Sequence, residues 1–114
     1  SFIALTVNTS YYVGEEHVAS SVAAIPVTEV EKMGISVDDQ SAIEHFVLEE
    51  LYKMARRSEL VMSAMEWGEE EDDKPKTPIL LVMDEVLSDT DRAISYHKYW
   101  MDSNWYRFSL ERGR

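Results

Sequence analysis

The chain has 114 residues, the size of one compact domain, and we expect residues 1–114 to form a single domain. Hydrophobic residues make up 45% of the sequence and can form a core, which excludes a wholly disordered protein. There is no cysteine, so disulfide frameworks, thiolate metal sites and cysteine nucleophiles are excluded. With 22 acidic and 11 basic residues the net charge is −11, which disfavours direct binding to nucleic acid or to an anionic membrane and favours a basic protein partner.

The first residues lack the basic segment that begins a signal peptide. No apolar run reaches the roughly 18–20 residues that span a bilayer. Because cysteine is also absent, a reducing compartment fits best, and we expect a cytoplasmic protein.

Two strands are predicted at the start of the chain. Residues 2–7 are rich in Ile, Leu, Thr and Val, and residues 11–13 extend the same pattern. After a turn at residues 14–16, small and β-branched residues from 17 to 25 predict a second strand that pairs with the first.

A short helix and then a long helix are predicted next. Thr28 and Glu31 have the spacing of a capping box, which predicts a helix over residues 28–33. From residue 41 to residue 67, apolar side chains recur at steps of three and four, and this period places them on one face of a long helix. That face would contain Ile43, Phe46, Val47, Leu51, Met54, Val61 and Met65.

The second half of the chain is predicted to contain a loop and three strands. Residues 69–78 combine five consecutive carboxylates with two prolines, which predicts an acidic flexible loop. Residues 79–87 begin with a continuous apolar run that is typical of a buried strand. The aromatic-rich residues 93–101 favour a further strand, with a helix over residues 89–101 as the alternative. Residues 105–110 alternate with period two and would complete a C-terminal hairpin.

The predicted fold class is therefore α+β. We expect an antiparallel sheet of four to five strands packed against one long helix, in the order β-β-α-α-β-β-β.

Catalytic and cofactor motifs are absent from the sequence. Four scattered glycines cannot form a phosphate-binding loop, and no serine-hydrolase or zinc-protease motif occurs. His45 and Glu49 share one face of the predicted helix, but a metal site needs three or four convergent ligands. Asp84 and Glu85 form a carboxylate pair whose spacing is not specific in so acidic a chain. We therefore predict no enzyme, no cofactor, and no catalytic, cofactor-binding or metal-binding residue.

Negative charge is concentrated before residue 92 and is densest at residues 69–73. An extended acidic surface can imitate the spaced phosphates of nucleic acid. The sequence thus favours a small acidic inhibitor that covers the basic surface of a nucleic-acid-handling enzyme, as a DNA mimic, an anti-defence protein of a phage or mobile element, or an immunity protein would. The predicted partner-binding residues of this acidic surface are Glu69, Glu70, Glu71, Asp72, Asp73, Asp38, Asp39 and Glu49.

The C-terminal segment has a different character. Residues 92–114 contain five basic and two acidic residues among several aromatic ones. Arg and aromatic residues dominate the binding energy of protein interfaces. The alternative function is therefore a structural or assembly subunit that forms a homo-oligomer through an aromatic C-terminal hairpin. The predicted partner-binding residues of this hairpin are Tyr99, Trp100, Trp105 and Arg107.

Overall fold

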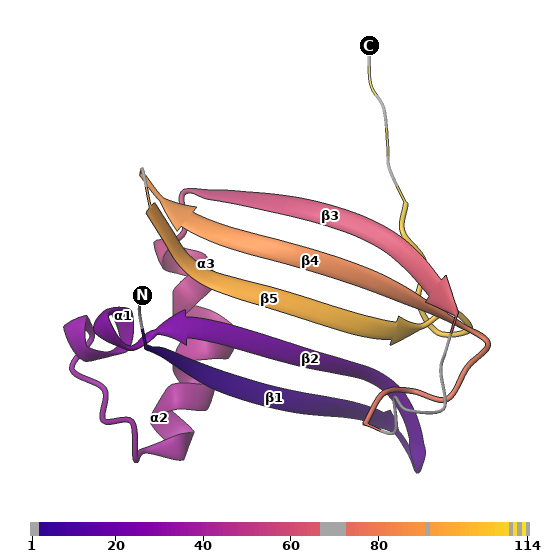
Figure 1. The fold of residues 1–114 in the computed structure, drawn as a ribbon, viewed down its shortest axis with the longest axis horizontal. Coiled ribbons are helices and arrows are strands. Elements are labelled where there is room, and N and C mark those ends of the chain that lie inside the picture. The colour runs from indigo at the N-terminus through magenta and orange to yellow at the C-terminus, as the bar shows by residue number, and fades with distance from the viewer. Residues whose placement is uncertain (1–2, 67–72, 91, 110, 112, 114) are drawn as a thin grey trace.

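Five antiparallel strands form one sheet, and a helical layer crosses one of its faces (Figure 1). The structure is a computed structural model that describes residues 3–66, 73–90, 92–109, 111 and 113. The strand order is β1-β2-β5-β4-β3, so β1 and β3 are the two edges of the sheet. The strands are β1 (Ala4–Val13), β2 (Glu16–Pro26), β3 (Arg57–Glu66), β4 (Ile79–Asp89) and β5 (Arg92–Asp102).

Short helical segments connect β2 to β3. Three of them follow one another without a break and cross the sheet near the end where β2 finishes and β3 begins (Figure 1). Asp39 caps the first of these by accepting a hydrogen bond of 3.1 Å from the amide of Ala42. The middle one is a turn of π-helix, a feature that is frequent at functional sites. The segments are α1 (Val27–Lys32), α2 (Gln40–His45), η1 (Phe46–Glu50) and α3 (Leu51–Met54).

The core lies between this helical stretch and the sheet. Phe46 and Leu51 are fully buried against residues of β2, β4 and β5. Burial of each large apolar side chain stabilises the fold by about 1.5–3 kcal/mol. The core cluster consists of Ile25, Val30, Phe46, Leu51, Leu87 and Ile94.

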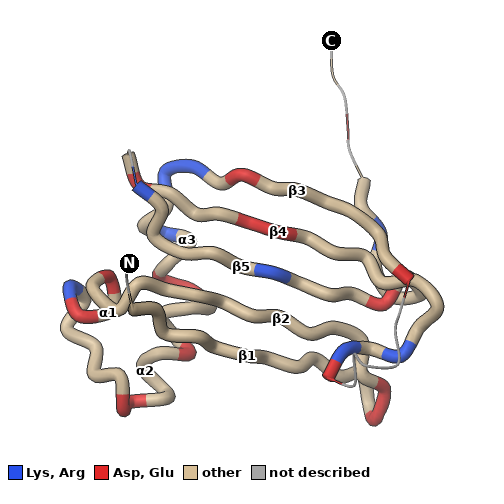
Figure 2. The backbone as a smooth tube through the Cα atoms, viewed as in Figure 1, with Lys and Arg blue, Asp and Glu red and all other residues tan. Residues whose placement is uncertain are grey.

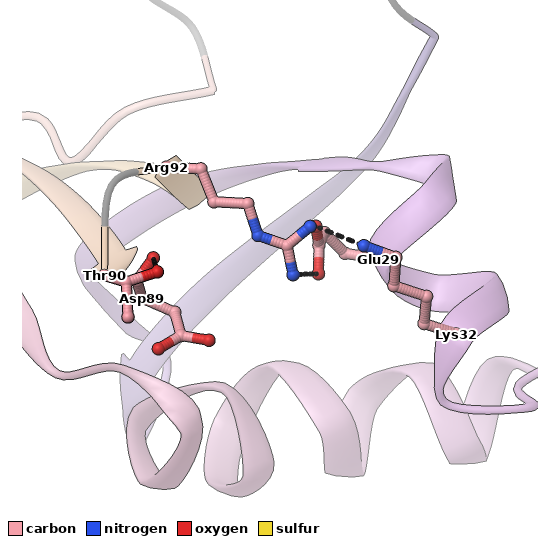
Figure 3. Close-up of polar contacts among 5 residues, drawn as sticks. All are labelled: Glu29, Lys32, Asp89, Thr90 and Arg92. Atoms are coloured by element: carbon pink, nitrogen blue, oxygen red, sulfur yellow. Dashed lines mark hydrogen bonds and ion pairs between the residues drawn. The ribbon is translucent and has the colours of Figure 1, made fainter.

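An ion-pair group joins α1 to the start of β5 (Figure 3). Glu29 of α1 is only 4% exposed. The guanidinium of Arg92 contacts both oxygens of this carboxylate, with Nη1 2.9 Å from Oε1 and Nη2 3.3 Å from Oε2. Lys32 Nζ lies 3.6 Å from the same Oε1. Because a buried carboxylate has lost its hydration, these contacts compensate it and fix α1 to the sheet.

The predicted α+β fold with an antiparallel sheet is confirmed, and the sheet has five strands. The prediction of one long helix over residues 41–67 is wrong. The helical stretch ends at Met54, because Ala55 adopts extended backbone angles of φ −70° and ψ 135°. The amide of Arg56 then donates to the carbonyl of Ser88 at 2.8 Å, and the chain continues as β3 in register with β4.

The C-terminal part of the chain also differs from the prediction. Residues 92–102 are a strand, so the alternative of a helix there is wrong. The predicted strand over residues 105–110 is wrong for residues 105–109, and residue 110 lies outside the described residues. Instead, the amides of Trp105 and Tyr106 both donate to the carbonyl of Asp102, at 3.0 and 3.1 Å, and form a turn.

The predicted acidic loop falls partly outside the described residues, which omit residues 67–72. Residues 73–78 lie on the sheet face opposite the helices, where Lys74 Nζ is 4.2 Å from the ring centre of Trp100. Ser20 Oγ also donates to the carbonyl of Asp73 at 2.8 Å. Among the described residues, no helix is long and apolar enough to cross a bilayer.

Candidate functional site

The strand register brings polar residues together on the helix-covered face of the sheet. In antiparallel strands, directly opposed residues point to the same face. Val7 pairs with Ala23, Ala23 with His97, and His97 with Glu85, so one row crosses four strands. The next row contains Thr9, Ser21, Tyr99 and Met83.

The helical stretch presents one flank to this part of the sheet. A helix returns to the same flank about every four residues, which groups Glu44, Leu48 and Tyr52. Glu44 and Leu48 line a groove against β1, and Tyr52 reaches Glu85 on β4. The flank therefore extends from one edge strand to the far side of β5.

The groove lies between β1 and the α2–η1 segment and has a volume of about 670 Å³. This volume is within the range of small-molecule sites, roughly 300–1,000 Å³. Six consecutive residues of β1, from 5 to 10, line it, and none of them is charged (Figure 2). Because β1 is an edge strand, its outer backbone amides and carbonyls have no neighbouring strand. The other lining residues are Val37, Asp38, Gln40, Ile43, Glu44, Val47 and Leu48.

A cluster of aromatic and acidic side chains lies two strands away from the groove. Tyr52 Oη donates to Glu85 Oε1 at 2.9 Å and lies 2.7 Å from Tyr99 Oη. The His97 ring lies next to both tyrosines, with ring centres 5.8 Å from Tyr52 and 6.2 Å from Tyr99. Its Nε2 is 2.8 Å from Ser95 Oγ. We call the groove and these four residues (Tyr52, Glu85, His97 and Tyr99) together the sheet–helix site.

Burial sets the protonation of the aromatic members of this cluster. It raises the pKa of Tyr52 far above its usual value, and the hydrogen bond with Tyr99 adds to the effect. It also raises the pKa of Tyr99. Burial lowers the pKa of His97, so the imidazole is neutral at pH 7. Both phenols are thus hydrogen-bond donors at neutral pH, and the arrangement is suited to binding rather than to nucleophilic chemistry.

The electrostatic character of the sheet–helix site is negative. Asp38 and Glu44 line the groove, and Glu85 is only 9% exposed in the cluster. Within the described part of the chain, no Lys or Arg forms an ion pair with Glu85, whose observed partner is the Tyr52 hydroxyl. A buried carboxylate with one neutral donor can accept further hydrogen bonds from a ligand.

Tyr52 and Glu85 also line a second pocket of about 210 Å³, and two arginines, Arg56 and Arg57, line it with them. Arg56 Nε lies 3.2 Å from Asp89 Oδ1, and Arg57 Nη2 lies 3.5 Å from Glu59 Oε1. Their charges are therefore offset by carboxylates outside the site.

A second group could hold a metal ion in principle. Because η1 is a π-turn, His45 contacts two successive carboxylates, with Nδ1 3.5 Å from Glu49 Oε2 and Nε2 3.4 Å from Glu50 Oε1. One ligand atom from each residue lies within 4.8 Å of the others. The group is largely exposed, and Glu50 also pairs with Lys53 at 3.6 Å. These contacts describe a surface ion-pair group.

The predicted acidic surface is only partly described. Glu69 to Asp72 lie outside the described residues. Asp73 pairs with Lys74 at 2.8 Å on the sheet face opposite the helices. Asp38 and Asp39 precede α2 on the helix side, where Asp38 lines the groove. Glu49 contacts His45 on η1.

The predicted aromatic surface is divided between the two faces of the sheet. Tyr99 belongs to the sheet–helix site, whereas Trp100 points to the opposite face beneath Lys74. Trp105 and Arg107 follow β5 in the turn and the exposed segment beyond it. The hairpin that was expected to present them as one surface is not formed by the described residues.

Tyr52, Glu85 and His97 are not among the site residues predicted from the sequence. A signal for Glu85 was present, because it interrupts an apolar strand at a position whose neighbours two residues away, Met83 and Leu87, are apolar. No pattern in the sequence links Tyr52 to it, since 33 residues separate the two.

Comparison with solved structures places this site in a known fold. No protein-family model matches the sequence, and no curated protein matches it either. A GntR-family transcriptional regulator from Enterococcus faecalis V583 superimposes with a TM-score of 0.74 at 17% identity, over 96% of this chain and 81% of that one. The effector-binding domain of the Bacillus subtilis trehalose repressor superimposes with a TM-score of 0.67 at 17% identity, over 96% and 79%. The chain shares this fold. The ligand-binding domain of a GntR-family regulator from Bordetella bronchiseptica is also similar, with a TM-score of 0.68 at 16% identity, over 95% and 72%.

This likeness corrects the functional expectation from charge. The interpretation as an acidic inhibitor, DNA mimic, immunity protein or phage anti-defence protein is wrong, because the fold is that of effector-binding and ligand-binding domains of regulators. The expected basic partner loses its support with it. A high negative charge affects the solubility of a protein and its repulsion of other anions, but it does not determine the fold.

Proposed function

We propose that the chain is a small-molecule-binding domain of a regulatory protein, with no catalytic role, and that its ligand binds in the sheet–helix site. The observation that carries this proposal is a groove of about 670 Å³ on the same face of the sheet as the hydrogen-bonded residues Tyr52, Glu85 and Tyr99, in a fold shared with regulator ligand-binding domains. Ligand sites commonly combine an apolar surface with a few positioned polar groups, as the groove combines Leu5, Val7 and Val47 with Gln40 and Glu44.

The charges of the site select a class of ligand. Asp38, Glu44 and Glu85 would repel a phosphate or carboxylate, and burial keeps His97 neutral. Glu85 instead accepts hydroxyl or ammonium donors. The ligand that fits best is a neutral polyhydroxyl compound, such as a sugar, or an amine.

A thermal-shift panel tests the proposal. The panel contains neutral mono- and disaccharides, primary amines and polyamines, and the phosphorylated forms of the same sugars. We expect at least one neutral or amine compound to raise the melting temperature, because a ligand at 100 times its dissociation constant stabilises the native state by about 2.7 kcal/mol. The corresponding phosphorylated sugar should have no effect.

Variants locate the binding. Tyr52→Phe removes the hydroxyl that contacts Glu85 and Tyr99, and Glu85→Gln removes the buried charge; each should weaken binding about tenfold, which corresponds to one lost charge-assisted hydrogen bond. The matched control is Glu31→Gln, an exposed carboxylate on α1 that lines no part of the site, and it should bind like the wild type. Stabilisation by phosphorylated compounds alone, or equal binding by all three variants, would overturn the proposal.

A further inference from the structure

The π-turn η1 brings together three side chains that could not all meet on an ordinary α-helix. An α-helix turns about 100° per residue, so residues five apart lie about 140° from each other around its axis. In η1 the amide of Leu51 instead donates to the carbonyl of Phe46, five residues back, and this wider turn aligns residues that are five apart. Glu50 therefore lies beside His45 together with Glu49, the partner at the ordinary spacing of four.

The contacts of His45 favour a bound cation. Each of its two ring nitrogens faces a carboxylate, with Nδ1 3.5 Å from Glu49 Oε2 and Nε2 3.4 Å from Glu50 Oε1. A neutral imidazole has only one N–H, so its other nitrogen turns a lone pair toward a carboxylate oxygen. These two groups repel each other unless a cation lies between them, and either a second proton or a metal ion removes the repulsion.

We propose that His45, Glu49 and Glu50 bind one Zn²⁺ ion. One ligand atom of each residue lies within 4.8 Å of the other two. Atoms that bind the same tetrahedral zinc ion are about 3.4 Å apart, because each is about 2.1 Å from the metal. Largely exposed side chains can reach this spacing by small rotations, and water can complete the coordination of the ion.

The donor atoms favour zinc over magnesium and calcium. Mg²⁺ and Ca²⁺ prefer oxygen ligands alone, whereas Zn²⁺ readily combines an imidazole nitrogen with carboxylate oxygens. Two carboxylates balance the charge of the ion, and the net charge of −11 attracts cations to the chain. The inference does not depend on the proposed function, since none of the three residues lines the groove.

Lys53 competes with a metal ion at this position. Its Nζ lies 3.6 Å from Glu50 Oε1, the same oxygen that faces His45. The ammonium group occupies this carboxylate and repels an approaching cation. Lys53→Gln should therefore tighten zinc binding by about threefold, which is the size of a surface ion-pair contribution.

Isothermal titration calorimetry of the whole chain with zinc chloride tests the proposal. We expect one Zn²⁺ ion per chain, which an excess of magnesium chloride should not displace. His45→Gln and Glu50→Gln should each weaken binding by about tenfold or more, because each removes one of three ligands. His17→Gln is the matched control and should bind zinc like the wild type, since His17 lines a pocket with Glu16 and Asp102 but belongs to no three-ligand group of the described residues.

A nitrogen NMR spectrum of the imidazoles keeps the test decisive if a variant fails to fold. In the wild type, zinc should shift the ring signals of His45, while those of His17 and His97 stay in place. The absence of zinc binding, or a shift of another imidazole instead, would refute the proposal. An unchanged zinc affinity in Glu50→Gln would refute it too, because the ordinary helical pair of His45 and Glu49 would then be sufficient.

Discussion

His97 shows how one buried side chain connects the stability of the domain with its candidate site. Its ring lies between Ser95, which contacts Nε2 at 2.8 Å, and the tyrosines of the sheet–helix site. Burial disfavours the charged imidazolium and lowers the pKa of His97 in the folded chain below its ordinary value of 6.5. The unfolded chain therefore binds the proton more readily than the folded one.

The sign of the resulting pH dependence follows from this difference. Stability from neutral His97 is fully present above about pH 6.5 and is lost as the pH falls from there through the lower folded pKa. We predict that His97→Gln flattens the fall in unfolding free energy between pH 7.5 and pH 5, relative to the wild type. Urea unfolding at a series of pH values, together with an NMR titration of the imidazole, measures both quantities. An imidazole that titrates at or above 6.5 in the folded protein would contradict the prediction.

The residues of the candidate site illustrate what a sequence reveals at this scale. In the sequence, Glu85 is one of 22 acidic residues, and nothing distinguishes it from its neighbour Asp84 as a site residue. The structure separates them, because Asp84 is half exposed beside Lys98 at 3.7 Å whereas Glu85 is buried beneath Tyr52. Because successive side chains of a strand point to opposite faces, Asp84 and Glu85 must lie on different faces of the sheet. Which of these faces is covered depends on where the helical segments pack, and the sequence does not reveal that.

At the level of the elements, an ion-pair group and the buried side chain of Val30 both fix α1 to the sheet. Arg92→Ala would leave the buried Glu29 carboxylate with Lys32 alone, at 3.6 Å. We predict a loss of about 1–2 kcal/mol in unfolding free energy, which is the value of charge-assisted hydrogen bonds after allowance for the half-exposed guanidinium. Chemical denaturation measures this loss.

Lys53→Ala provides the matched control, because the Lys53 pair with Glu50 is on the surface at 3.6 Å and the lysine is largely exposed. Its removal should change the unfolding free energy by no more than about 0.5 kcal/mol. If Arg92→Ala and Lys53→Ala lowered the unfolding free energy equally, the burial of Glu29 would not strengthen its ion pair, and the prediction would be wrong.

Several elements were predictable from sequence, and the exception has a physical explanation. The strands at residues 17–25 and 79–87 were predicted with small boundary errors, since their buried residues impose a clear pattern. Residues 57–66 instead matched a helical period through Val61 and Met65 but form β3. Because every residue of β3 is exposed, burial imposes neither a period of two nor one of 3.6, and pairing with β4 determines the structure.

For the molecule as a whole, the composition led to the expectation that the negative charge attracts a basic partner protein, and the structural comparisons do not support this. Within the proposed ligand site, we expect Asp38, Glu44 and Glu85 to disfavour anionic ligands. The edge strand β1 lies beside the candidate ligand groove.

The proposed function requires that a neutral or amine ligand binds on the helix-covered face of the sheet. Intermolecular nuclear Overhauser effects between the chain and the most stabilising compound of the panel test it most directly, because Tyr99 and Trp100 are adjacent in sequence and lie on opposite faces. We expect contacts from the ligand to the rings of Tyr52 and Tyr99 and to Val7. Contacts to Trp100 and Lys98 in their place would contradict it.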